Sequence, residues 1–297
     1  MKLIIFFGLL IILLKSKLTR HSDDVLKRQK IYIEAHRGVT NAQKNHNTKE
    51  AVLDAISKGI ESFETDCWLT KDKKVVLSHD DGIKVKEKKK KKYVFFNESN
   101  WKQLKKYMKQ KKYKKKKVPL LDDIMKITKN KIFMNLEIKD ENDEIWEHIQ
   151  KLIEKHKYYD QISISSFYFK YYDKIVKYNN DYNRKIVFSF LFRNFNGSNI
   201  TTENETLIEG PDIYDIDAPN HQITINWIEL RNNKEFVESV HSKGMVLGVY
   251  FYNEPSDVQY YDLFMIGVDV IITNYPLKVA SQLEEFIAND IELEDCL

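Results

Sequence analysis

Five short motifs with charged or polar side chains each follow, or end, a run of apolar residues. They are His36-Arg37-Gly38, Glu64-Thr65-Asp66, His79-Asp80, Glu137-Ile138-Lys139 and Thr273-Asn274-Tyr275-Pro276. Together they place two histidines, several carboxylates, an arginine and a lysine at predicted strand ends. Phosphoester chemistry on a divalent metal needs this set, because carboxylates hold hard cations and cationic side chains hold phosphate oxygens.

Three carboxylates are spaced so that they could hold one metal ion. Glu64 and Asp66 lie two residues apart on a predicted strand, so alternation places both side chains on one face. Two such carboxylates repel each other unless a cation lies between them. Glu137 ends another apolar strand and completes an oxygen-rich set that suits Mg²⁺ or Ca²⁺. We therefore predict one divalent cation at this set; ion pairs with Arg37 or Lys139 are the alternative.

Two histidines accompany the predicted metal site. His36 and His79 each end a strand, and a pair of imidazoles suits general acid/base work because imidazole titrates near neutrality. Arg37 can hold phosphate oxygens in a bidentate fork. Lys139 shares the strand face of Glu137 and could neutralise charge that develops on a phosphoryl group. For either histidine alone, a structural role is the alternative interpretation.

The rest of the chain alternates strand-like and helix-like stretches, which predicts an α/β fold with parallel strands. Chemistry at many strand ends favours a (β/α)8 TIM barrel, whose catalytic groups come from the carboxyl ends of several strands. A doubly wound nucleotide-binding sheet would usually show a glycine-rich turn after its first strand, and none follows here. Nine stretches compete for eight barrel positions: 31–35, 63–68, 74–78, 132–138, 162–165, 186–190, 213–216, 245–250 and 268–272.

Helices are predicted between most of these strands. Asn47-Thr48-Lys49-Glu50 resembles a capping box with Asn47 as the cap, and Gly59 offers a left-handed stop for the helix that follows. Further helical stretches lie at 99–108, 119–128, 144–156 and 233–243.

Composition indicates a folded chain. Of its 297 residues, 42% are hydrophobic, which is enough for a sizeable core. We expect one barrel domain over 30–285, a lysine-rich insertion at 84–117 after the third strand, and a C-terminal tail at 286–297. The insertion is either a solvated excursion or a surface for anionic lipid headgroups. The net charge of only +4 argues against nucleic-acid binding, and no obligate protein partner is evident.

The N-terminus carries a targeting signal. Lys2 precedes an apolar run at 3–14, and basic residues follow that run. The run is shorter than the about 20 apolar residues of a bilayer span and fits the apolar region of a signal peptide. Because no small-x-small cleavage site follows, residues 1–20 are either a signal peptide or a short membrane anchor.

A secretory route, ending in a secreted or membrane-anchored protein, agrees with the glycosylation sequons of the chain, whereas its cysteines give no support. The two cysteines, Cys67 and Cys296, set up neither a disulfide framework nor a metal pattern. Four N-glycosylation sequons begin at Asn97, Asn196, Asn199 and Asn204. They suit a glycoprotein, although some arise by chance in an asparagine-rich chain.

Motifs over about residues 31–285 resemble the glycerophosphodiester phosphodiesterase family in type and order. They are Ala35-His36-Arg37-Gly38, Asn47-Thr48, Glu64-Thr65-Asp66, Leu69-Thr70-Lys71-Asp72, Val75-Val76-Leu77-Ser78-His79-Asp80, Val118-Pro119-Leu120-Leu121, Leu136-Glu137-Ile138-Lys139, Ser166-Phe167, Gly267-Val268-Asp269 and Thr273-Asn274-Tyr275-Pro276. The first half is the more specific, and the stretch 196–229 matches poorly.

The resemblance implies a metal-dependent TIM barrel that cleaves glycerophosphodiesters to an alcohol and a glycerol phosphate. It gives Glu64, Asp66 and Glu137 to the metal, makes His36 and His79 the acid/base pair, and has Arg37 and Lys139 hold phosphate. Preference for acylated substrates would need an apolar groove, for which Phe167 and Tyr250 are candidates; packing in the core is the alternative for both. The sequence from Glu64 to Asp80 also resembles that of the family's lysophospholipase D branch, which acts on lysophospholipids and yields lysophosphatidic acid.

Three residues depart from the family pattern. His46 stands where the family usually has Glu, Asn274 where it has Asp, and Tyr250 where Trp is common. None of them removes a proposed ligand or acid/base group, and with Asn274 the last motif reads as a fold marker. Two other functions remain: a phosphoinositide-specific phospholipase C-like enzyme, and a catalytically silent phosphoester-binding barrel.

Overall fold

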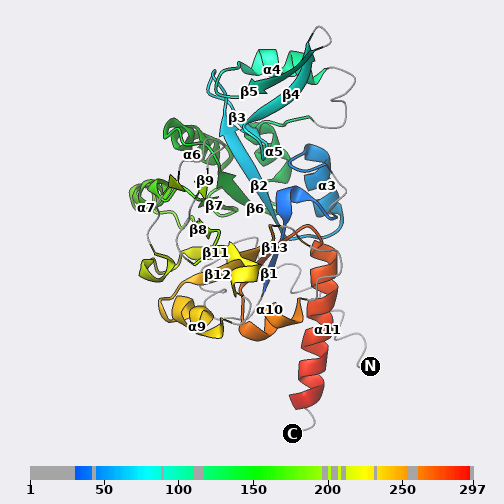
Figure 1. Ribbon diagram of the computed structural model, residues 1–297, viewed down its shortest axis with the longest axis vertical. Helices are drawn as coiled ribbons and strands as arrows, with labels where there is room; N and C mark the ends of the chain where they lie inside the picture. The colour runs from blue at the N-terminus through cyan, green and yellow to red at the C-terminus, as the bar shows by residue number, and fades with distance from the viewer. Residues whose placement is uncertain are drawn as a thin grey trace.

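Eight parallel strands close into a barrel in the computed structural model (Figure 1). The structure describes residues 31–41, 45–87, 90–109, 117–195, 200–201, 207–208, 212–230, 233–252, 254 and 260–294. The barrel strands are β1 (Tyr32–Ala35), β2 (Ser62–Leu69), β6 (Phe133–Ile138), β7 (Ile162–Ser166), β8 (Phe188–Phe192), β11 (Gln222–Asn226), β12 (Val246–Tyr250) and β13 (Val270–Thr273). Their order is β1-β13-β12-β11-β8-β7-β6-β2, and a parallel β1–β2 pairing closes the ring.

Helices surround this barrel and cover its outer face (Figure 1). They are α3 (Lys49–Ser57), α5 (Leu121–Thr128), α6 (Glu144–His156), α7 (Lys170–Tyr182), α8 (Trp227–Leu230), α9 (Lys234–Ser242), α10 (Tyr261–Ile266) and α11 (Pro276–Glu294). The predicted helices at 119–128, 144–156 and 233–243 are thus confirmed. Among the described residues, no helix is long and apolar enough to cross a bilayer.

Strand alternation separates an apolar outer layer from a barrel interior that is polar on several strands and apolar around Val246, Val270 and Ile272. Phe63, Leu136 and Ile164 belong to the main hydrophobic cluster, which also contains residues of the surrounding helices. The alternate positions carry buried polar side chains, and the Asn135 amide donates to Glu34 Oε2 at 2.8 Å. Because inner positions are polar, several barrel strands alternate in sequence instead of forming continuous apolar runs.

The fold corrects two of the nine strand predictions. Residues Ile213–Asp215 form a 3₁₀ helix (η3), and the barrel strand of this region is β11, which the predicted set lacks. The predicted strand at 74–78 exists as β3 (Val75–Leu77), but it pairs antiparallel with β2 and stays outside the ring. Seven of the nine predicted stretches are therefore barrel strands, and the unpredicted β11 is the eighth.

The helix after β1 begins one residue later than the capping box suggests. Thr48 is the N-cap of α3, and its hydroxyl accepts the Ala51 N–H at 3.2 Å. Asn47 instead has a left-handed backbone, with φ 52°. Gly59, with φ 74°, follows the C-cap as a left-handed residue should.

The lysine-rich insertion contains an organised lobe (Figure 1). A hairpin of β4 (Gly82–Glu87) and β5 (Lys90–Phe95) is followed by α4 (Trp101–Met108), and a separate hydrophobic cluster holds the three together. The predicted helix at 99–108 is confirmed, whereas the hairpin was not predicted. Elsewhere, β9 (Ile200–Thr201) and β10 (Leu207–Ile208) form a small antiparallel pair.

The predicted C-terminal tail and N-terminal leader can be compared with the structure only in part. The expected tail at 286–297 includes the last turns of α11, which continues to Glu294. The predicted leader at 1–20 and the sequons at 196, 199 and 204 lie outside the described residues.

Candidate active site

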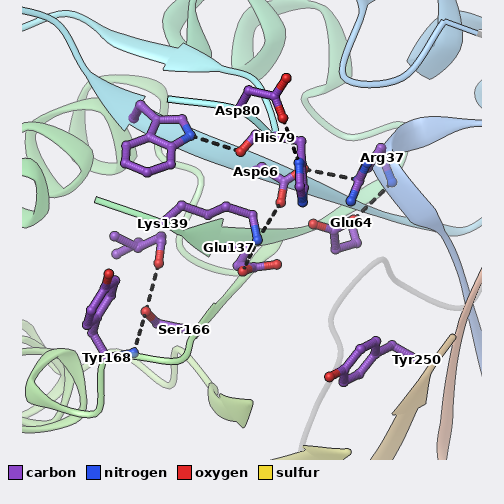
Figure 2. Close-up of polar contacts among 12 residues, drawn as sticks. Arg37, Glu64, Asp66, His79, Asp80, Glu137, Lys139, Ser166, Tyr168 and Tyr250 are labelled. Atoms are coloured by element: carbon purple, nitrogen blue, oxygen red, sulfur yellow. Dashed lines mark hydrogen bonds and ion pairs between the residues drawn. The ribbon is translucent and has the colours of Figure 1, made fainter. Parts of the chain in front are cut away.

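Three carboxylates meet at the carboxyl end of the barrel, as alternation predicted (Figure 2). Glu64 and Asp66 lie on β2, and Glu137 lies on the neighbouring β6, where it pairs in register with Asp66. One oxygen from each of the three lies within 4.8 Å of the others. Glu64 and Asp66 are buried, at 3% and 1% exposure. Such close, buried acids have the geometry of a cation site.

Two cationic side chains approach the same cluster (Figure 2). Lys139 Nζ lies 2.5 Å from Glu137 Oε1 and 3.2 Å from Asp66 Oδ1, and Arg37 Nε lies 3.3 Å from Asp66 Oδ2. Burial opposes ionisation of Asp66, but Lys139 and Arg37 together hold the pKa of its carboxyl below the usual value. The ion pairs considered as an alternative to a metal are therefore present, so they alone do not distinguish the two interpretations.

Glu64 distinguishes a metal site from a purely structural ion-pair network. Its Oε2 accepts the Arg37 N–H at 2.9 Å, but its buried Oε1 has no hydrogen-bond partner among the described residues. Burial, followed by the charges of Asp66 and Glu137, raises the pKa of its carboxyl well above the ordinary value. A divalent cation would relieve both the repulsion and the unpaired oxygen, so the residues present fit such an ion.

The loop after β1 aims a main-chain donor at this site. Arg37 adopts φ 53°, an uncommon conformation for a residue with a side chain, and directs its N–H to Glu64. Gly38 follows with φ 73°, and a Cβ there would lie 2.9 Å from Cγ2 of Val52. The His-Arg-Gly motif therefore needs its glycine for both backbone conformation and contact with α3.

Asn47 is a site residue that sequence reasoning assigned to a helix cap. Its Nδ2 donates to Asp66 Oδ2 at 2.7 Å, while its Oδ1 accepts the Thr65 hydroxyl at 2.6 Å and the Asp66 N–H at 3.2 Å. These hydrogen bonds fix the position of the Asp66 carboxylate. Only the family-like Asn-Thr pair could have indicated the role.

A chain of polar contacts positions His36. Its Nδ1 lies 2.9 Å from Asn274 Oδ1. Asn274 also donates its backbone N–H to Glu254 at 2.5 Å and makes a side-chain hydrogen bond to the same carboxylate. Because the Asn274 amide nitrogen faces Glu254, its oxygen faces His36 and accepts a hydrogen bond from the Nδ1–H. The interpretation of Asn274 as a fold marker is thus corrected: it touches a predicted acid/base residue.

The fixed tautomer leaves His36 Nε2 as an acceptor, 3.9 Å from Glu64 Oε2. Burial, and after it the charge of Arg37, lower the pKa of His36 to about 3. His36 is therefore neutral at physiological pH.

His79 lies close to Asp66 (Figure 2), and its side chain is 46% exposed, against 22% for that of His36. It follows β3, and Ser78 holds this segment to β2 through its N–H, which donates to the Asp66 carbonyl at 3.0 Å. His79 Nδ1 lies 3.0 Å from Asp80 Oδ1, so the neighbouring acid orients the ring even though the two residues are adjacent in sequence. Trp68 Nε1 donates to the His79 carbonyl at 3.2 Å.

The two predicted wall residues lie on other strand ends. The Phe167 ring follows β7, with Lys139 Nζ 5.9 Å and the Arg193 guanidinium carbon 5.7 Å from its centroid. Tyr250 ends β12, apart from the charged cluster (Figure 2), and its hydroxyl donates to the Phe192 carbonyl at 3.1 Å. Phe167 is thus adjacent to a predicted phosphate ligand, whereas the Tyr250 hydroxyl is already engaged by the barrel.

Fold and site together define a TIM barrel with an acid-lined mouth, and sequence comparison gives its family. The chain matches the glycerophosphoryl diester phosphodiesterase family over residues 36–278, and it belongs to that family. A search among curated proteins gives no significant match.

Solved structures share this fold over most of their length. A Galdieria sulphuraria protein assigned to the glycerophosphodiester phosphodiesterases is 19% identical, with a TM-score of 0.67 over 86% of this chain and 98% of its own. An Oleispira antarctica phosphodiesterase, in complex with the product sn-glycerol-3-phosphate, is 18% identical, with a TM-score of 0.64 over 87% and 99%. A Thermotoga maritima glycerophosphodiester phosphodiesterase is 22% identical, with a TM-score of 0.58 over 85% and 98%.

Proposed function

We propose that this protein hydrolyses glycerophosphodiesters, or lysophospholipids, to an alcohol and a glycerol phosphate or lysophosphatidic acid, with one bound Mg²⁺ or Ca²⁺. One observation carries the proposal: three carboxylates, two of them buried and one with an unpaired oxygen on Glu64, lie together with two cationic side chains and close to two histidines. Membership of the glycerophosphoryl diester phosphodiesterase family agrees with it and disfavours a phosphoinositide phospholipase C-like enzyme.

The metal and the cationic residues would share the phosphate. Glu64, Asp66 and Glu137 would hold the cation, which supplies Lewis-acid stabilisation of charge on the phosphoryl oxygens. Arg37 and Lys139 lie on the same rim and offer hydrogen bonds to those oxygens. Their ion pairs with Asp66 keep the Arg37 and Lys139 side chains in place before substrate binds.

The histidines divide the proton transfers. His36 presents a neutral Nε2 and takes the proton of the attacking hydroxyl, which belongs to water or to the glycerol C2 position. A bond forms from this oxygen to phosphorus as the bond from phosphorus to the alcohol oxygen breaks. His79, held by Asp80, gives a proton to the departing alcohol. Attack by glycerol would yield a cyclic phosphate first, which water then opens.

Comparison of acylated with deacylated substrates tests the proposal most directly. We expect choline or ethanolamine release from glycerophosphocholine, lysophosphatidylcholine and their ethanolamine analogues in Mg²⁺ or Ca²⁺, and none in excess chelator. Preference for the acylated forms would identify a lysophospholipase D, with Phe167 as part of an apolar wall. Absence of release from every substrate with either metal would favour the catalytically silent barrel.

Asn274 gives a prediction about histidine positioning. Asn274→Leu preserves side-chain volume but removes the oxygen that accepts from His36 Nδ1. Loss of a group that orients a functional histidine should lower kcat by roughly 10- to 100-fold with little change in KM. Steady-state kinetics on the best substrate would measure both constants.

Asn274→Asp is the matched control, because it keeps an accepting oxygen and matches the residue usual in the family. Burial already raises the pKa of Glu254, so this residue can take up the proton that two facing carboxylates would share. Asp should therefore retain most of kcat. Equal losses in the Leu and Asp variants would contradict the positioning role.

We further propose a secretory location, carried by the apolar N-terminal run and its basic flanks. Asn97 is the one sequon within the described residues, and it is exposed in the turn after β5. Glycosidase treatment of protein from its native source would shift electrophoretic mobility if this asparagine is glycosylated. Substrates that reside in membranes would also require association with a membrane surface.

A further inference from the structure

Positive charge is concentrated in the lobe formed by β4, β5 and α4. Residues 82–109 hold eleven lysines and two acidic residues, whereas the whole chain has a net charge of only +4. All nine lysines of this segment whose side chains are described are exposed: Lys84, Lys86, Lys90, Lys91, Lys92, Lys102, Lys105, Lys106 and Lys109.

The hairpin sorts these residues onto two faces. Ile83, Val85 and Val94 are buried against Leu104 and Met108 of α4. The register pairs Lys84 with Tyr93, Lys86 with Lys91 and Gly82 with Phe95, so these side chains share the opposite, outer face. We call the outer set Lys84, Lys86, Lys91, Tyr93 and Phe95 the hairpin face.

Two aromatic rings accompany the lysines of the hairpin face. Tyr93 and Phe95 pack edge to face with centroids 4.9 Å apart, and Phe95 remains 36% exposed. The Tyr93 hydroxyl donates to Asp81 Oδ1 at 2.5 Å, so its ring is fixed on the surface. Gly82 leaves room for that ring, since a Cβ there would lie 2.8 Å from Tyr93 Cε1. Fixed aromatic rings beside cations suit the boundary between water and lipid.

Folding alone does not favour this arrangement. Lys86 lies directly opposite Lys91, and like charges across two strands destabilise a hairpin. A negatively charged binding partner would relieve the repulsion between Lys86 and Lys91.

The lobe stands beside the catalytic mouth (Figure 1). Asp81 is the only residue between the His79-Asp80 pair and β4, and Trp68 of β2 packs against the lobe's hydrophobic cluster while donating to the His79 carbonyl. The Lys71 N–H donates to the Phe96 carbonyl at 3.1 Å, which fastens the lobe to the β2–β3 turn. The lobe projects beyond β2 and β3, at the end of the molecule away from the C-terminus of α11.

We propose that the hairpin face docks on an anionic membrane surface, with lysines at the headgroups and Phe95 in the interface. This inference rests on the proposed function, because a phospholipid-derived substrate would then be taken up beside the surface on which the enzyme sits. Nucleic acid fits less well, since Tyr93 and Phe95 pack edge to face on one another and leave less free ring surface for stacked bases.

Vesicle binding tests the proposal without any turnover. The full chain is mixed with phosphatidylcholine vesicles that contain or lack phosphatidylserine, and the bound fraction is measured by sedimentation at several salt concentrations. We expect binding that requires phosphatidylserine and falls as salt rises. The variant K84Q/K86Q/K91Q should bind about a hundredfold more weakly, since each lysine near such a surface contributes roughly fivefold.

Matched variants separate this face from overall charge. K102Q/K105Q/K106Q removes three charges from the exposed side of α4 and should weaken binding far less. Phe95→Ala should weaken it, whereas Tyr182→Ala, which truncates an aromatic side chain 47% exposed on α7, should not. Hydrolysis of soluble glycerophosphocholine by the hairpin variant should equal that of the wild type, which also shows that the variant is folded.

Three results would overturn the proposal. The first is vesicle binding that is unchanged in K84Q/K86Q/K91Q, and the second is equal weakening by the two triple variants. The third is displacement of the protein from vesicles by a short single-stranded oligonucleotide that binds the wild type but not K84Q/K86Q/K91Q. This result would assign the hairpin face to nucleic acid. Failure of hydrolysis with intact vesicle binding would instead count against the proposed function alone.

Discussion

Glu64→Gln should abolish metal-dependent turnover and at the same time stabilise the metal-free protein. The substitution removes one carboxylate from a set of three, two of them buried, whose oxygens lie within 4.8 Å of one another. A bound cation supplies several kcal/mol of charge stabilisation, so loss of its site should lower kcat/KM on the order of a thousandfold. Turnover with and without Mg²⁺ or Ca²⁺ would measure this loss.

The gain in stability follows from the direction of the pKa shift. Burial and the charge of Asp66 raise the pKa of Glu64 above its unfolded value, so ionising this residue opposes folding. No penalty exists below the unfolded pKa, where both states are protonated. The penalty grows as pH rises from the unfolded to the folded pKa, and each unit of this shift costs about 1.4 kcal/mol.

Thermal unfolding in chelator, followed as pH rises from acid to neutral, would measure this penalty. The wild type should lose stability along the series, and Glu64→Gln should lose less, because glutamine does not ionise. Glutamine also keeps an oxygen for the Arg37 N–H. Added metal should raise the Tm of the wild type but not that of Glu64→Gln. Glu141→Gln, which changes an acid outside the cluster, is the control. A metal-induced rise of equal size in Glu64→Gln would refute the triad as the binding site.

Local patterns in the sequence predicted what depends on strand periodicity. The two-residue spacing of Glu64 and Asp66 places both on the inner face of β2, and the apolar run before Glu137 becomes the neighbouring β6. The strand β11 escaped prediction because its inner positions, Gln222 and Thr224, are buried polar residues. The predicted strand falls instead on 213–216, where three of the four residues, Ile213, Tyr214 and Ile216, are hydrophobic.

Long-range contacts are what the sequence could not supply. Asn47 looked like a helix cap, and only folding shows that its amide holds Asp66. Glu254 carried no signal, since its role depends on Asn274, 20 positions further along the chain. Both residues act through side chains brought together by barrel closure, and neither spacing nor composition encodes such pairings.

His79→Ala should lower kcat on glycerophosphocholine by roughly two to four orders of magnitude, with KM changed far less. The imidazole lies at the mouth with Asp80 behind it, which suits a proton donor to the alcohol oxygen. If this is its role, the defect should depend on the leaving group. A p-nitrophenyl ester of glycerol phosphate needs no proton at departure, so the variant should recover most of its activity on that ester.

His36→Ala should behave differently, because a proton acceptor is needed whichever group leaves. Its Nδ1 is committed to Asn274 and its Nε2 is free to accept, so its loss should impair hydrolysis of both substrates similarly. His148→Ala, which truncates a histidine on the surface of α6, should leave both rates near wild type. If His36→Ala, and not His79→Ala, regains activity on the p-nitrophenyl ester, then His79 is the base and His36 the acid. If both variants still hydrolyse glycerophosphocholine at a substantial rate, neither histidine takes part in the proton transfers.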